Sequence, residues 1–211
     1  MPTIAIVSQK GGSGKTTLAL HLATSAAYAK KQSAVIDTDP QATAAAWGDW
    51  RGNFLPIVVT SPPARLAKTI ENAVGNGVEV VVIDTPPHAE AAMRESIKAA
   101  DLVLIPTRPR AFDLHALEAI AELVVAAEKP AYVVLNAVPA RATRQVAEAT
   151  ETCEGLGLKV CPVTFGDRAD FHRSSGKGEV ASEIDADGKA ASEVAELWQW
   201  ARKQLGIKAK G

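Results

Sequence analysis

Residues Thr3–Thr17 read TIAIVSQKGGSGKTT, and this stretch decides the fold. An apolar run of strand character enters a glycine-rich loop, which is followed by Lys15, Thr16 and an alanine- and leucine-rich segment of helical character. Glycines let the backbone wrap closely around an anion, and the N–H groups at the start of a helix attract negative charge. The order of strand, loop and helix predicts a phosphate-binding loop, with a tight strand-to-helix turn as the alternative.

The residue types in this loop have distinct expected roles. The ammonium group of Lys15 should reach the β- and γ-phosphates of a nucleoside triphosphate, and the hydroxyl of Thr16 should bind Mg²⁺. The residues expected to contact the nucleotide here are Lys10, Gly11, Gly12, Ser13, Gly14, Lys15, Thr16 and Thr17. We therefore expect a nucleotide and Mg²⁺ as ligands.

Short runs rich in β-branched residues alternate with longer alanine-rich segments along the chain. The expected strands are Thr3–Val7, Ser33–Asp37, Ile57–Thr60, Val78–Asp84, Leu102–Pro106, Ala131–Asn136 and Lys159–Pro162. The expected helices are Lys15–Lys30, Pro63–Val74, Ala89–Ala99, Leu114–Ala127, Ala142–Leu156 and Ser192–Leu205. Continuous Val and Ile runs are typical of strands buried on both faces. The pattern predicts an α/β protein with a three-layer P-loop NTPase fold: a mostly parallel, twisted sheet of about seven strands with helices on both faces.

Size and composition bound the domain organisation. A chain of 211 residues with 47% hydrophobic content fits one domain with a core, which we expect to span residues 1–211. The segment Asp167–Lys189 is rich in Gly, Ser and charged residues and has weak periodicity. We expect irregular surface structure around a short helix there, in a region suited to contacts with partners.

Charge and cysteine content exclude several classes of protein. A formal net charge of -1 disfavours coating of nucleic acid by the whole surface but leaves room for a local basic patch. Two cysteines, Cys153 and Cys161, cannot build a disulfide framework or a four-cysteine zinc site, so we expect buried thiols in a reducing, cytosolic compartment. The chain has no apolar run of the roughly 20 residues that a membrane-spanning helix needs, and Met1–Ser8 lacks the pattern of a signal peptide.

Carboxylates stand at the ends of two expected strands. The second strand ends in DTDPQ, residues 37–41, and the fourth runs into Asp84 and then Thr85–Pro87. Ligands bind at the carboxyl ends of strands in open α/β sheets, where one carboxylate can orient an attacking water and another can hold Mg²⁺. Asp84 has the Walker B arrangement and should hold Mg²⁺ through water, with a helix-capping Asp as the alternative.

The residue at the front of the loop narrows the class. Lys10 in KGGSGKT resembles the signature lysine of deviant Walker A proteins, which include ParA, MinD, the nitrogenase iron protein and the arsenite-pump ATPase. In that family the lysine crosses a dimer interface and touches the partner's ATP. The resemblance implies an Mg²⁺-dependent ATPase that dimerises with ATP, with Lys10, Lys15 and Asp39 as catalytic residues. A solvated lysine at the edge of a loop is the alternative.

The resemblance to ParA proteins covers nearly the whole chain. It implies that Asp39 positions the attacking water, that Asp37 supports the Mg²⁺ site with Thr16 and Asp84, and that Thr85–Pro87 forms a second switch. In ParA and MinD proteins an Asn in the place of Asn136 contacts adenine, and an amide has the donor and acceptor that this base needs. A turn-forming Asn is the alternative at that position.

Relatives with other functions fit less well. The nitrogenase iron protein needs cysteines for an iron-sulfur cluster, and the first cysteine in this chain is Cys153. MinD-type proteins end in a membrane-binding amphipathic helix. Here the apolar face from Val194 to Leu205 is expected to pack on its own sheet, although Trp198 and Trp200 keep membrane binding open. The phosphate loop begins at residue 10, so the chain resembles the small ParA proteins without an N-terminal helix-turn-helix domain.

DNA binding must then come from the ATPase domain. ParA dimers bind DNA without sequence preference through basic residues on their later helices, and such binding weakens steeply with salt. The candidates in this chain are Arg141, Arg144, Arg168, Arg173 and Lys177. Solvated surface cations are the alternative, because acidic residues are interleaved with them. Two further cations, Arg108 and Arg110, cannot be assigned from the sequence between a partner protein and nucleic acid.

The resemblance implies an ATP-dependent homodimer that binds DNA and drives plasmid or chromosome partition with a cargo-bound, ParB-like partner that stimulates hydrolysis. Its location would be the cytoplasm, on the nucleoid. One alternative is ParA-like positioning of a protein cluster or organelle, and another is a MinD-like membrane-associated ATPase. A metabolic P-loop ligase is a third, although the DTDPQ segment disfavours it.

Overall fold

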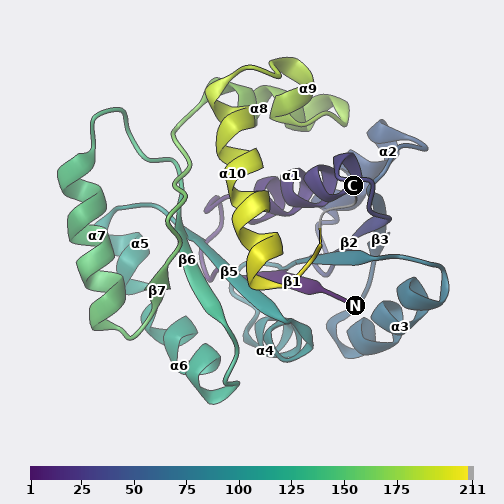
Figure 1. Ribbon diagram of the computed structural model, residues 1–211. Coiled ribbons are helices and arrows are strands. Elements are labelled where there is room, and N and C mark those ends of the chain that lie inside the picture. Colours follow the sequence, from purple (N-terminus) through teal and green to yellow (C-terminus); the bar gives the residue numbers. More distant parts are fainter. Residues whose placement is uncertain (209–211) are drawn as a thin grey trace.

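The computed structural model describes residues 1–208, and residues 209–211 of the expected domain lie outside the described part. A seven-stranded sheet crosses this part of the molecule in the order β3-β2-β4-β1-β5-β6-β7, and every pairing of neighbouring strands is parallel (Figure 1). The strands are β1 (Thr3–Ile6), β2 (Ser33–Asp37), β3 (Ile57–Thr60), β4 (Val80–Asp84), β5 (Leu102–Thr107), β6 (Ala131–Leu135) and β7 (Lys159–Val160). The predicted α/β class and strand number are confirmed.

Helices cover both faces of this sheet. They are α1 (Lys15–Tyr28), α2 (Thr43–Arg51), α3 (Leu66–Gly75), α4 (Glu90–Ala99), α5 (Ala111–His115), α6 (Glu118–Ala126), α7 (Thr143–Gly155), α8 (Ala169–Ser174), α9 (Ala181–Ile184) and α10 (Lys189–Gln204), with 3₁₀ turns at Pro63–Arg65 and Ser175–Lys177. Successive strand residues point to opposite faces, so Ile4 and Ile6 join one core and Ala5 joins the other. The first core packs under α1 and α10, and the second packs under α4 and α6.

A helix that was not expected follows β2, and one expected helix is two helices in the structure. Residues Thr43–Arg51 form α2 directly after the DTDPQ segment, although no helix was expected there. The expected helix Leu114–Ala127 is divided into α5 and α6. The expected helix at Pro63–Val74 begins instead as a 3₁₀ turn and continues as α3.

The expectation of irregular surface structure over Asp167–Lys189 was wrong in part. This segment forms α8, a 3₁₀ turn and α9, and its side chains Phe171, Val180 and Ala181 are buried in the core. A polar stretch separates Phe171 from Val180 and Ala181, so the sequence shows no helical repeat of apolar residues that would mark this core contact.

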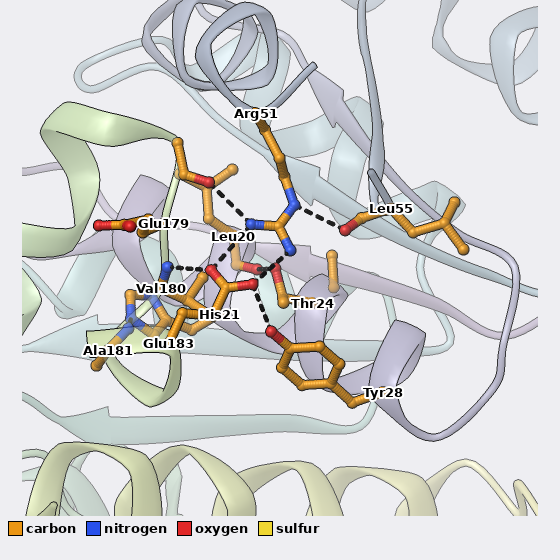
Figure 2. Close-up of polar contacts among 12 residues, drawn as sticks. Leu20, His21, Thr24, Tyr28, Arg51, Leu55, Glu179, Val180, Ala181 and Glu183 are labelled. Atoms are coloured by element: carbon orange, nitrogen blue, oxygen red, sulfur yellow. Dashed lines mark hydrogen bonds and ion pairs between the residues drawn. The ribbon is translucent and has the colours of Figure 1, made fainter. Parts of the chain in front are cut away.

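Polar contacts hold the same segment against α1 and α2 (Figure 2). Arg51, at the end of α2, donates to Glu183 through Nη1 at 3.0 Å and Nη2 at 2.9 Å, and Tyr28 of α1 also donates to Glu183. The buried His21 ring lies between the Thr17 carbonyl, 2.7 Å from Nδ1, and the Ala181 N–H, 3.0 Å from Nε2. An N–H donor at Nε2 requires that nitrogen to accept, so the ring is neutral with its proton on Nδ1.

The C-terminal helix α10 buries its apolar face against the protein. Val194, Leu197, Trp198 and Ala201 lie in the core that α1 shares, as the sequence predicted. None of the helices that the structure describes is long and apolar enough to cross a bilayer. Both cysteines are buried and unbridged, which confirms the expected buried thiols, and burial raises the pKa of each thiol to about 11.

Candidate nucleotide site

The glycine-rich loop joins the end of β1 to the start of α1. Gly12 and Gly14 have φ of +70° and +97°, a conformation that side-chain-bearing residues rarely adopt. A Cβ added to Gly14 would lie 2.1 Å from the amide nitrogen of Asn136, so space as well as conformation requires glycine. The loop therefore holds the alternating backbone geometry in which successive N–H groups form an anion-binding nest.

Lys15 is the buried cation of this loop. Only 6% of it is exposed, and its Nζ donates to the Lys10 carbonyl at 3.0 Å, across the mouth of the loop. Burial lowers the pKa of Lys15, while the nearby charges of Asp84 and Asp39 act in the opposite direction. A desolvated ammonium group beside an anion-binding nest is suited to binding phosphate oxygens.

Thr16 and Asp84 meet where the sequence placed the metal. Thr16 Oγ1 donates to Asp84 Oδ2 at 2.6 Å, and Asp84 Oδ1 is buried without a hydrogen-bond partner among the described residues. Burial raises the pKa of Asp84 to about 7, and the neighbouring Asp37 charge adds to this effect. A buried carboxylate oxygen without a partner is costly unless a cation or a proton reaches it.

Asp37 and Asp39 organise the loop that leads into α2. Asp37 Oδ1 accepts from the Asp39 N–H at 2.9 Å, and its Oδ2 accepts from the Ala45 N–H at 3.1 Å. Asp39 in turn accepts from the Gln41 N–H at 2.9 Å. Burial raises the pKa of Asp37, and the backbone N–H groups oppose that rise. Asp37 pairs in register with Asp84, so these two residues stand at the carboxyl ends of neighbouring strands, and Asp39 follows in the loop after β2.

These features fit Mg²⁺ and a nucleotide. Asp84 Oδ1 and the Ser13 hydroxyl are buried without hydrogen-bond partners among the described residues, and the glycines at positive φ shape an anion-binding nest. A nucleotide and Mg²⁺ would supply the partners that these groups lack. The described residues contain no group of three or more His, Cys, Asp or Glu side chains that could hold a metal by themselves. A metal here would therefore need oxygen atoms from Thr16, water and phosphate as well.

Lys10 lies at the rim of the loop, not inside it. Its Nζ is 3.8 Å from Asp113 Oδ1 and 5.9 Å from the centre of the Phe112 ring. Phe112 is 82% exposed and Lys10 is about one-third exposed. The two lysines of the loop thus occupy different environments: Lys15 is buried beside the phosphate nest, and Lys10 is held at the surface by α5.

A cleft of about 270 Å³ continues from the loop between the ends of β5 and β6. Pro106, Val134 and Phe165 line it with apolar atoms, and Asn136 stands at its edge. The Asn136 amide donates to the Ser13 carbonyl at 2.7 Å and accepts from the Ala137 N–H at 2.8 Å, which leaves one N–H and one lone pair. The shape suits a planar base beside the phosphate loop.

Sequence reasoning missed several residues of this cleft. Arg108 reaches the loop from the end of β5, and Asp167 and Phe165 come from the segment after β7. The sequence marked Arg108 only as a cation of unassigned role, and it marked Phe165 and Asp167 only by their position after an expected strand.

The expected DNA-binding residues are distributed over separate parts of the fold. Arg144 lies in the first turn of α7, which Figure 1 draws at the left, and Arg141 lies in the loop before it. Arg173 and Lys177 lie on α8 and the following turn, drawn at the top. Arg168 lines the nucleotide cleft and donates through Nε to Glu193 of α10 at 2.9 Å. The candidates therefore come from separate elements of one subunit.

A phosphate nest at a helix start, a lysine within it and a Thr–Asp pair at the end of a parallel strand define a P-loop nucleotide-binding protein. Residues 4–180 match the CobQ/CobB/MinD/ParA nucleotide binding domain, so the chain belongs to this family. It is a nucleotide-binding ATPase of the ParA/MinD type.

Several proteins of known name are similar to this chain in sequence. The chain is 34% identical over 161 residues to the maintenance of carboxysome distribution protein A of Gloeobacter kilaueensis, covering 74% of this chain and 72% of that protein. It is 33% identical over 117 residues to the protein ParA of Rhizobium radiobacter, covering 54% and 51%. The chromosome-partitioning ATPase Soj of Thermus thermophilus is 27% identical over 155 residues, covering 60% of this chain and 61% of Soj.

Solved structures confirm the fold. The septum site-determining protein MinD of Pyrococcus horikoshii, complexed with Mg-ADP, matches with a TM-score of 0.78 at 17% identity, over 100% of this chain and 99% of that one. Cyanothece McdA in complex with ATP matches with a TM-score of 0.71 at 18% identity, over 100% and 98%.

Proposed function

We propose that this chain is an ATP-switched positioning ATPase. ATP and Mg²⁺ bind at the glycine-rich loop, two subunits dimerise around two nucleotides, and the dimer binds DNA without sequence preference. A cargo-bound partner protein, ParB-like or an adaptor, then stimulates hydrolysis and releases monomers. The observation that carries the proposal is the position of Lys10, which lies at the rim of its own phosphate loop while Lys15 is buried beside the nest.

The proposed roles of the residues follow from their positions. Lys15 binds the phosphates of its own subunit, and Lys10 reaches the nucleotide of the second subunit. Thr16 and Asp84 would hold Mg²⁺, supported by Asp37, and the metal when bound would neutralise charge on the phosphate oxygens. Asp39 orients the attacking water, and the apolar cleft beside Asn136 takes the adenine.

The distribution of cations bears on DNA binding. Arg141, Arg173 and Lys177 are exposed, whereas Arg168 is paired with Glu193 and Arg144 is paired with Glu148 at 2.7 Å. Arg141 lies before α7, whereas Arg173 and Lys177 lie on α8 and the turn after it. A dimer that brings two copies of these elements together is therefore the better candidate for a continuous basic surface. Neutralising several phosphates would make retention on DNA strongly salt-dependent.

The cargo is DNA in the first form of the proposal, and the relative named as the chromosome-partitioning ATPase Soj favours it. A second form keeps the same cycle but positions a protein body, and the relative named for carboxysome distribution favours it. The partner distinguishes the two: a DNA-binding adaptor indicates partition, and a component of a protein assembly indicates positioning. In both forms we propose a cytoplasmic location on the nucleoid.

Oligomeric state tests the proposal. Light scattering on size-exclusion chromatography should show a monomer without nucleotide and a dimer with Mg-ATP when hydrolysis is blocked by Asp39→Ala. Adding Lys10→Ala to that variant should keep ATP bound and abolish the dimer, and Lys15→Ala should abolish ATP binding itself. A monomer at saturating Mg-ATP in the Asp39→Ala protein would overturn the switch.

DNA binding is tested separately on the same blocked dimer. Retention on non-specific duplex DNA should require ATP and fall with rising salt. Arg141→Ala and Lys177→Ala should weaken retention, whereas Arg94→Ala, which removes an exposed arginine of α4 already paired with Glu90 at 2.6 Å, should not. Equal retention by all three variants would place the DNA surface elsewhere.

A further inference from the structure

Arg108 is a cation beside the phosphate loop that the proposed cycle does not use. It follows the last residue of β5, is partly buried, and lines the nucleotide cleft. Its Nη2 donates to the carbonyl of Gly12, 96 positions earlier in the chain. The contact joins the end of a central strand to the middle of the glycine-rich loop.

Asn136 makes the matching contact one residue further along the loop. Its Nδ2 donates to the Ser13 carbonyl at 2.7 Å. The two side chains are themselves tied together, because the Asn136 N–H donates to the Thr107 carbonyl at 2.7 Å, next to Arg108. Two successive carbonyls of the loop are therefore held by side chains from the ends of two neighbouring strands, β5 and β6.

Holding these carbonyls fixes the direction of the N–H groups that bind an anion. In a trans peptide the C=O of one residue and the N–H of the next point in opposite directions. With the Gly12 and Ser13 carbonyls turned toward Arg108 and Asn136, the N–H groups of Ser13 and Gly14 point away from them. Glycines at positive φ have many other conformations open to them, so this geometry needs an external constraint.

The Arg108 guanidinium also has bonding capacity left over. Its Nε–H is buried without a hydrogen-bond partner among the described residues. A guanidinium group whose Nη2 is engaged and whose Nε–H is unpaired is suited to bind a phosphate or ribose oxygen of the nucleotide after a small rotation of the side chain. Lysine could supply the charge at this place but not two donors in a fixed geometry.

We propose that Arg108 is a positioning residue of the nucleotide site: it holds the Gly12 carbonyl so that the loop is preformed for the α- and β-phosphates. This inference rests on the proposed use of the loop for ATP. Because the preformed N–H groups serve the phosphates that ATP and ADP share, the loss of Arg108 affects both nucleotides alike, before any dimer forms.

The test is calorimetric titration of the full chain with Mg-ATP and with Mg-ADP. Asp39→Ala combined with Lys10→Ala serves as the background for ATP, so that neither hydrolysis nor dimerisation interferes. Arg108→Ala should weaken both nucleotides by a similar factor, about tenfold to a hundredfold, as expected for a lost charge-assisted hydrogen bond. Arg110→Ala, which removes an exposed cation two residues away, should stay within about twofold. Arg108→Lys should recover only part of the affinity.

The outcomes separate this inference from the proposed function. If the parent protein binds neither nucleotide, the proposed function fails with it. If the parent binds nucleotide and Arg108→Ala binds it equally well, the positioning role is wrong. The role is also wrong if Arg108→Lys has the full affinity of the parent. A loss confined to Mg-ATP would also overturn it, because that result assigns Arg108 to the γ-phosphate. Thermal unfolding of the nucleotide-free variants, expected to match the parent, shows that the fold is intact.

Discussion

Thr16 Oγ1 donates a 2.6 Å hydrogen bond to Asp84 Oδ2, joining the first turn of α1 to the end of β4 across 68 positions of sequence. This bond links the phosphate loop to the strand that carries the expected metal-binding carboxylate. It occupies one oxygen of Asp84 and leaves the other without a partner among residues 1–208. In the nucleotide-free protein Thr16 therefore stabilises a carboxylate that the fold has otherwise desolvated.

The Thr16 hydroxyl is expected to matter before any ligand binds. Thr16→Ala leaves both Asp84 oxygens buried without a donor, and this should cost roughly 1–3 kcal/mol of unfolding free energy at pH 8. Thr16→Ser keeps the hydroxyl and should lose much less. Urea denaturation of the two variants without nucleotide measures the difference, and equal stabilities would mean that the hydrogen bond contributes nothing to the free protein.

The pKa of Asp84 predicts a pH dependence of stability. Burial raises this pKa to about 7 in the folded chain, so the folded state holds the proton more tightly than the unfolded state does. The resulting stabilisation is complete below the unfolded pKa of roughly 4 and is lost as the pH rises through about 7. Asp84→Asn cannot titrate and should gain stability relative to the parent between pH 5 and pH 8, by at most about 1.4 kcal/mol per pH unit.

Titration of His21 also changes the stability over this pH range, so the effect of Asp84 has to be measured as a difference between the parent and Asp84→Asn. Burial lowers the pKa of His21 to about 4, so the stability that depends on its neutral ring is lost as the pH falls below about 6.5. This trend runs opposite to that of Asp84 over the same range, but it is common to the parent and to Asp84→Asn. Denaturation curves of the two proteins at four pH values isolate the carboxylate, and parallel stability profiles would contradict the prediction.

Local signals were enough to predict the sheet and the phosphate loop. The glycines, Lys15 and Thr16 lie in one continuous stretch, and buried parallel strands appear as apolar runs. The same signals failed for α2, whose preceding residue, Ala42, has no side-chain donor or acceptor to mark a helix start. That helix is fixed by distant contacts: the Trp47 ring nitrogen donates to the Glu179 carbonyl at 3.0 Å.

Within the site, the sequence predicted at which end of the strands the residues lie, but not which groups their side chains contact. Asp37 and Asp84 were expected at one edge of the sheet, and their pairing in register confirms that placement. The sequence could not show that both carboxylate oxygens of Asp37 accept from backbone N–H groups, or that Arg108 donates to Gly12. Each of these contacts depends on how the strand ends and loops turn in three dimensions.

Asp113 should oppose dimerisation by holding Lys10. The pair is partly exposed, with Nζ and Oδ1 3.8 Å apart, so the interaction is worth no more than about 1 kcal/mol per subunit. Asp113→Asn should therefore lower the dimer dissociation constant with Mg-ATP by about twofold to tenfold in the Asp39→Ala background. Asp113→Glu keeps the charge and serves as the control. Sedimentation equilibrium measures both, and weaker dimers in Asp113→Asn would show that Asp113 supports the interface.

The Arg51–Glu183 contact should be the strongest ion pair for stability in the described part of the chain. Arg51 is only 7% exposed and also donates to the Gly178 and Leu55 carbonyls, so Arg51→Ala leaves several acceptors unpaired. Burial opposes ionisation of Glu183, but hydrogen bonds from Arg51 and Tyr28 hold its pKa below the usual value. Arg51→Ala should cost about 2–4 kcal/mol, whereas Arg94→Ala, which breaks the exposed pair with Glu90, should cost under about 0.5 kcal/mol. Urea denaturation at pH 7 compares the two, and similar losses would mean that burial adds nothing to the Arg51 pair.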